Sequence, residues 1–108
     1  MRMPEKERLR TRIFDWAAKL RVTPAQIRIQ AMSKKWGSCS SAGRVSFSLD
    51  LVRRPKTFQD FVIVHELLHL RLRNHGKLFH SFLRAHLRDN PWVSRAISRV
   101  SNSPGQTP

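Results

Sequence analysis

The first twenty positions of the chain alternate between apolar and charged residues with the spacing of a helix. The apolar positions fall three or four residues apart: Leu9, Ile13, Trp16, Ala17 and Leu20. Such a pattern predicts an amphipathic helix from Pro4 to Leu20 that turns one face to a core. Val22-Thr23-Pro24 follows and breaks the helix.

Two later segments alternate apolar and polar residues one by one, as half-buried strands do. They are residues 27–31 and 45–51, and a loop rich in serine and glycine, residues 34–43, separates them. We therefore predict that the two strands are neighbours in a small antiparallel sheet. Its apolar side is expected to face a helix.

The next segment is apolar almost all round a helical projection. Its apolar residues are Phe58, Phe61, Val62, Ile63, Val64, Leu67, Leu68 and Leu70. A helix of this kind is buried, so it is predicted to be the central element of the core. Thr57 is the expected N-cap, with Asp60 as its capping-box partner. Asn74 and Gly76 both tolerate the left-handed conformation, so the helix is expected to end near Arg73 or Asn74.

The remainder of the chain predicts two further helices. One is amphipathic and runs from about Leu78 to Leu87, and Asp89-Asn90-Pro91 separates it from a short last helix. Together these elements predict one α+β domain over residues 1–100, with a small sheet packed on a central helix. Residues 101–108 show no periodicity and are expected to be a disordered tail.

The charge, the cysteine content and the apolar runs of the chain bear on its partners and on its place in the cell. The 108 residues include 21 Lys and Arg against 7 Asp and Glu, a net charge of +14. This balance is compatible with a nucleic-acid partner, and equally with a basic surface that has no partner. The single cysteine, Cys39, suits a reducing cytoplasm, and no signal peptide is evident at the N-terminus. No apolar run approaches the ~18 residues needed to span a membrane.

The central helix carries the clearest chemical signature, His65-Glu66-Leu67-Leu68-His69. Two histidines four residues apart lie on one helix face, with about 6 Å between their Cβ atoms. Both can reach one ion at the ~2.0–2.1 Å of a zinc–nitrogen bond. Glu66 is placed to accept a proton from a water that the metal activates. This is the HExxH signature of zinc hydrolases.

Spacing alone leaves the third ligand open. Along an unbroken helix, His75 and His80 would lie ~9 Å and ~16 Å beyond His69, so the chain must turn back for either to join the site. Cys39 is a further candidate as a thiolate, but a small residue packed behind the sheet is the favoured interpretation. His86, on the apolar face of its helix, is expected to be a core histidine.

Several motifs occurring in order resemble the YgjP-like metallopeptidase family, which is related to the SprT-like proteases. They are the segment 32–39 with its Trp36-Gly37-Ser38-Cys39 loop, the strand after it, Leu51 with Pro55, the HExxH segment, and residues 74–79. The resemblance implies a zincin-like fold in which His65, His69 and His75 bind Zn²⁺ and Glu66 is the general base. The match of residues 74–79 to the family's motif favours His75 over His80 as third ligand. His80 itself is a departure, because it stands where the family usually has an aromatic residue.

The function expected from these features is zinc-dependent hydrolysis of a peptide or protein substrate. Two alternatives remain open: hydrolysis of a nucleotide phosphoanhydride, and a basic nucleic-acid-binding module with structural zinc. The group that stabilises the oxyanion is also open. Its candidates are Arg71, Arg73, His80 and the backbone of residues 36–39.

Overall fold

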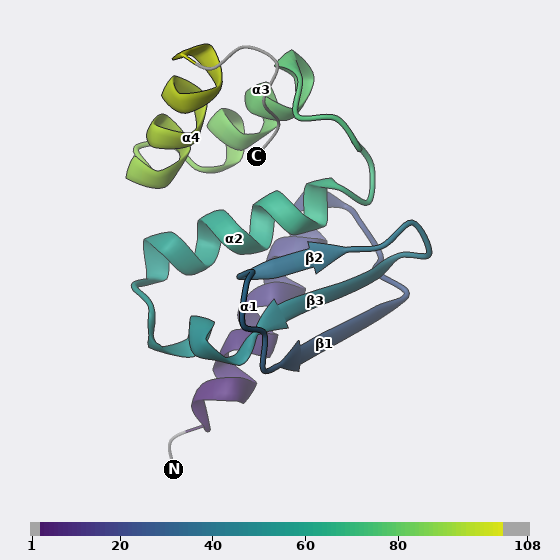
Figure 1. Cartoon of the computed structure of the whole chain (residues 1–108). Helices are drawn as coiled ribbons and strands as arrows, with labels where there is room; N and C mark the ends of the chain where they lie inside the picture. The colour runs from purple at the N-terminus through teal and green to yellow at the C-terminus, as the bar shows by residue number, and fades with distance from the viewer. Residues whose placement is uncertain (1–2, 103–108) are drawn as a thin grey trace.

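The structure of the chain is a computed structural model that describes residues 3–102. One helix precedes the three strands of a single sheet, and the other helices follow them along the chain (Figure 1). The elements are α1 (Glu5–Leu20), β1 (Gln26–Gln30), β2 (Gly37–Cys39), β3 (Arg44–Ser48), the 3-10 helix η1 (Leu49–Arg53), α2 (Lys56–Leu68), α3 (Lys77–His86) and α4 (Pro91–Asn102). The predicted α+β class is confirmed.

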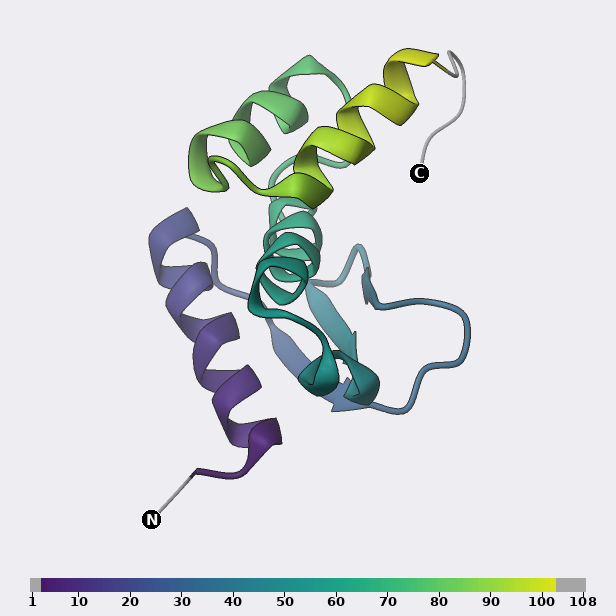
Figure 2. The same ribbon diagram turned by 90° about the vertical axis from the view of Figure 1, so that its left-hand side faces the viewer.

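Helix α2 is the centre of the molecule. Seven of its thirteen residues are buried, and it contacts α1, β2, β3, α3 and α4. Figures 1 and 2 show the sheet and α1 on one side of α2, and the α3–α4 pair on the other. The apolar circumference of this helix is therefore explained, because every face of it meets another element.

The pairing of the sheet differs from the prediction. The strand order is β1-β3-β2, with β1 parallel to β3 and β2 antiparallel to it. The two predicted strands are thus neighbours, but they run parallel, and the sheet is mixed. The reason is β2, which forms a hairpin with β3 through a turn at Gly43, whose φ is +85°. Short and rich in serine and glycine, β2 has little strand propensity and was predicted as loop.

The second predicted strand also ends early. Residues 49–53 form η1, in which Leu51 is buried and Leu49 is 42% exposed. The Ser48 hydroxyl accepts a hydrogen bond from the Asp50 backbone N–H and so caps this turn. Local capping by serine has replaced the continuation of the strand.

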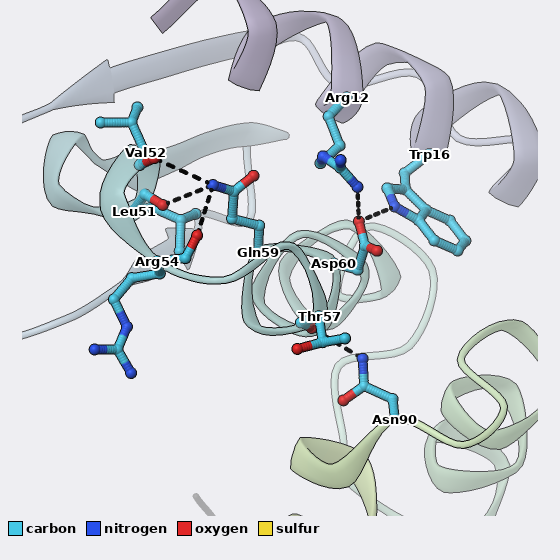
Figure 3. Close-up of polar contacts among 9 residues, drawn as sticks. All are labelled: Arg12, Trp16, Leu51, Val52, Arg54, Thr57, Gln59, Asp60 and Asn90. Atoms are coloured by element: carbon cyan, nitrogen blue, oxygen red, sulfur yellow. Dashed lines mark hydrogen bonds and ion pairs between the residues drawn. The ribbon is translucent and has the colours of Figure 1, made fainter. Parts of the chain in front are cut away.

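Polar side chains near the beginning of α2 attach it to neighbouring elements and do not cap it (Figure 3). Asp60 accepts hydrogen bonds from Arg12 at 2.7 Å and from Trp16 at 2.9 Å, both on α1. Gln59 donates to the carbonyl oxygens of Leu51 and Arg54. The predicted capping box of Thr57 and Asp60 is therefore wrong. Asp60 instead binds the Arg12 guanidinium, and a charge-assisted hydrogen bond of this kind is stronger than one to an uncharged backbone N–H.

The end of α2 comes earlier than predicted, at Leu68. The following residues close the helix with tighter bonds, from the N–H groups of His69, Leu70 and Arg71 to the carbonyl groups three residues before them. Neither Asn74 nor Gly76 has the positive φ of a left-handed conformation. The prediction that these two residues terminate the helix is therefore wrong, and a tightened last turn performs that role.

Helices α3 and α4 cover the remaining side of α2. Asp89 takes a left-handed φ of 60° between them, and Asn90 donates a hydrogen bond to the Thr57 carbonyl of α2 at 2.9 Å (Figure 3). Ser101 and Asn102 belong to α4, and the remainder of the predicted disordered tail lies outside the described residues. Within residues 3–102, no helix has the length and apolarity that crossing a bilayer requires.

Candidate metal centre

Three histidines meet at the C-terminal end of α2. His65 is on α2 and His69 is its C-cap, while His75 lies in the loop that leads back to α3. One ring nitrogen from each lies within 4.8 Å of the other two. The structure thus brings together the three histidines named by the family resemblance.

The ring nitrogens have the separation that a metal requires, and the second ring nitrogen of His69 has a partner that suits metal binding. His65 Nε2 and His75 Nε2 are 3.0 Å apart, close to the roughly 3.3 Å between two ligands of a tetrahedral ion with bonds of ~2.0–2.1 Å. His69 Nδ1 is 3.1 Å from the Leu72 carbonyl oxygen. A proton on Nδ1 satisfies that carbonyl and leaves Nε2 with a lone pair for a metal. These residues therefore fit a divalent ion.

Phe79 of α3 supports all three imidazole rings. Its ring centroid is 5.4 Å from that of His65, 5.0 Å from that of His69 and 4.9 Å from that of His75. The side chain is 1% exposed, so its position is fixed by the core. Phe79 lies in the amphipathic helix predicted from about Leu78 to Leu87, but its contact with the three histidines depends on how α3 packs against α2.

Glu66 lies beside the histidines with its side chain 11% exposed. Its Oε2 is 3.1 Å from His65 Nδ1. Gly37 of β2 approaches it closely, because a Cβ atom placed on Gly37 would lie 2.8 Å from Glu66 Cγ. The glycine therefore leaves the space that the Glu66 side chain occupies.

The histidines and Glu66 open into a cleft of about 570 Å³ between β2 and the loop after α2. Of the candidates for stabilising an oxyanion, Arg73 and residues 37–39 line this cleft. Arg71 does not, and its guanidinium donates to the Leu20 carbonyl oxygen at 3.4 Å. His80 is also outside the lining, on the first turn of α3.

Cys39, Trp36 and His86 lie outside the cluster of three histidines. Cys39 is half-buried and packs against the core, and it also lines the cleft, which the prediction of a packed residue did not include. Burial raises the pKa of its thiol, and the charge of Glu66 raises it further. Trp36 is 39% exposed and packs edge-on against Phe58. His86 is half-buried and stacks on Phe82.

The local environment keeps His75 neutral. Burial, followed by the proximity of His65 and His69, lowers the pKa of His75 from 6.5 to about 4. Burial also lowers the pKa of His69. Neutral imidazole is the form that binds a metal, so the lowered pKa values of His69 and His75 favour metal binding at neutral pH.

The lowered pKa of His75 predicts that the metal-free protein loses stability as the pH falls from 6.5 to about 4. In the unfolded chain His75 binds a proton near its ordinary pKa, whereas in the folded chain it stays neutral, so acid favours unfolding. The groups facing it are His65, Glu66, His69 and His80. The measurement is the melting temperature of metal-free protein from pH 7 to pH 4.

The control separates this effect from general acid unfolding. A His75→Gln variant should show a shallower decline of melting temperature than the wild type, while His86→Gln, outside the cluster, should follow the wild type. Equal slopes for His75→Gln and wild type would contradict the assignment.

Comparisons with known proteins show the family and the fold of the chain. A family model described as the YgjP-like metallopeptidase domain matches residues 2–96. Among solved structures, the chain is similar to the metallopeptidase zymogen jannalysin of Methanocaldococcus jannaschii, with a TM-score of 0.68 and 20% identity, covering 94% of this chain and 98% of that chain. At this identity the likeness shows the fold. No curated protein matches the chain. Because the family model covers nearly the whole described structure, the chain belongs to the YgjP-like metallopeptidase family.

Proposed function

We propose that the protein is a zinc-dependent peptidase in which His65, His69 and His75 hold the ion and Glu66 is the general base. The observation that carries the proposal is the meeting of three histidine ring nitrogens within 4.8 Å beside a buried glutamate. Three imidazoles and an adjacent cleft suit a catalytic zinc site, which keeps one position open. When bound, the zinc ion would lower the pKa of a water molecule and polarise the substrate carbonyl.

The part assigned to Glu66 is proton transfer. Its carboxylate lies at the wall of the same cleft as the histidines, where it accepts a proton from the attacking water and returns it to the leaving amine. Its contact with His65 Nδ1 adds a positioning role, because a proton shared there leaves His65 Nε2 free for the ion.

The shape of the cleft also supports a peptide substrate. β2 is an edge strand that pairs with β3 on one side, and its three residues all line the cleft. An extended peptide can add to such an edge through main-chain hydrogen bonds. Substrate bound in this way would run alongside the histidines.

The two alternatives gain no support from the site. Phosphoanhydride hydrolases that use Mg²⁺ favour carboxylate ligands, and the described cluster consists of three histidines. A structural zinc would be closed by four protein ligands, whereas this cluster contains three and opens into a cleft.

The proposal is tested with an unstructured protein such as casein. Purified protein should cleave it, lose activity on dialysis against a chelator, and regain activity with one equivalent of Zn²⁺. Retention of full activity after the metal has been removed would show that the reaction does not depend on these histidines as ligands.

Gly37→Ala is predicted to slow hydrolysis without loss of metal. The new methyl group would lie 2.8 Å from Glu66 Cγ and 3.1 Å from the Ser46 carbonyl oxygen. Either Glu66 or β2 must move, and a misplacement of about 1 Å can cost up to ~10²-fold in rate. The measurement is kcat on casein-derived peptide together with zinc content. Gly76→Ala is the matched control, because a Cβ at Gly76 meets nothing within 4 Å; equal activity of the two variants would contradict the prediction.

A further inference from the structure

The charged residues that line the cleft are unevenly balanced. Lys35 and Arg73 are basic, and Glu66 is the acidic residue among the lining residues. Glu66 is already engaged by His65 at 3.1 Å, and the ion pairs of the described chain include neither Lys35 nor Arg73. Both cations are exposed. Two positive charges at the cleft wall are therefore available to a substrate.

These two cations stand at opposite ends of β2. Lys35 precedes β2 by two residues. Arg73, in the loop after α2, is near enough to Cys39, the last residue of β2, for its charge to act on the thiol. A three-residue strand spans about 7 Å. A peptide lying along β2 would thus place side chains on both sides of the scissile bond within reach of a cation.

We infer that the cleft selects peptides with acidic side chains, Asp or Glu, flanking the scissile bond, with Lys35 and Arg73 as the residues that determine this specificity. The inference rests on the proposed peptidase function. Exposed ion pairs are individually weak, roughly two- to fivefold each in affinity, so two of them give about a tenfold preference over the neutral amide analogue. Attraction of acidic substrates to a basic protein would also raise the association rate at low salt.

A nucleic acid is the other polyanion that a basic cleft could receive. The proteins that hold single strands combine cationic grooves with aromatic side chains on which bases stack. The residues that line this cleft include no Phe, Tyr or Trp, and Trp36, next to it, has its ring occupied by Phe58 and by the Arg54 guanidinium. The cleft therefore fits an acidic peptide better than a nucleic acid.

The test uses quenched fluorescent peptides of one sequence that carry Glu or Gln on each side of the cleaved bond, with zinc-loaded full-length protein. Wild type should cleave the Glu peptide with about tenfold higher kcat/KM than the Gln peptide. Lys35→Gln and Arg73→Gln should each reduce this ratio, and the double variant should bring it close to one. Arg28→Gln removes the same charge from the exposed side of β1 and should leave the ratio unchanged.

Several outcomes would overturn the inference. One is equal cleavage of the Glu and Gln peptides by the wild type. Another is a loss of preference in Arg28→Gln as large as in Lys35→Gln and Arg73→Gln, which would show that the preference depends on net charge alone. If neither peptide is cleaved, the proposed function fails, and the inference is still decided by fluorescence anisotropy: zinc-loaded Glu66→Gln protein should bind the Glu peptide more tightly than the Gln peptide. A single-stranded oligonucleotide that displaces the peptide from wild type, and binds Arg73→Gln much more weakly, would assign the cleft to nucleic acid instead.

Discussion

Replacing Glu66 with glutamine is expected to lower the rate of peptide hydrolysis by roughly 10²–10⁴-fold while leaving the metal bound. Glutamine has nearly the same shape, so the close packing of this side chain against Gly37 is kept. Its amide cannot accept the proton of the attacking water. Its side-chain oxygen can still accept a hydrogen bond from His65 Nδ1, the contact that Glu66 Oε2 makes at 3.1 Å.

A Glu66→Ala variant distinguishes the two roles of this residue. Alanine removes both the base and the hydrogen-bond partner of His65. The Glu66→Ala variant should therefore lose as much activity as Glu66→Gln. It should also bind zinc about 10–100-fold more weakly, because a group that orients a metal ligand is lost. The measurements are kcat with casein-derived peptide and zinc affinity for both variants. Undiminished turnover in Glu66→Gln would rule out general-base catalysis by this residue.

Replacing His75 with alanine is expected to weaken zinc binding by more than about 100-fold. Loss of a residue that only supports a ligand costs up to about that amount, and loss of a ligand itself should cost more. The ring nitrogen of His75 lies 3.0 Å from that of His65, and removing it leaves two histidines from adjacent helical turns. His80→Ala is the matched control, since His80 lies five residues further on and is outside both the histidine cluster and the cleft. It should retain one zinc per chain.

Elemental analysis of the two purified variants distinguishes these assignments. Zinc retained by His75→Ala and lost by His80→Ala would show that the third ligand comes from α3 and not from the loop before it. Circular dichroism of both variants controls for unfolding, because His75 also packs against the core residue Phe79.

The first two histidines could be predicted from sequence because their relation is local. A four-residue spacing on a helix fixes the mutual position of His65 and His69 whatever surrounds them. The position of His75 depends on where the chain leaves α2, and the tightened turn after Leu68 that ends the helix contains no glycine or proline that would predict it. Here the family motif supplied what spacing could not.

The same difference between local and nonlocal relations explains one correct prediction about the fold and two of the errors. The burial of α2 follows from its composition, and it was predicted correctly. The parallel pairing of β1 with β3 depends on β2, whose few residues have weak strand propensity. The capping prediction for Asp60 failed for a related reason, since its partners Arg12 and Trp16 are more than forty residues away along the chain. Nonlocal contacts decided each of these features.

The coordination of the metal in the wild-type protein is the most direct test of the proposed site. X-ray absorption at the zinc edge of protein loaded with one equivalent should show three imidazole nitrogens at ~2.0–2.1 Å and a light-atom ligand at the remaining position. A sulfur ligand at ~2.3 Å would instead place the Cys39 thiolate on the ion and indicate a closed, structural centre. Failure of the purified protein to retain any zinc at neutral pH would contradict the three-histidine site itself.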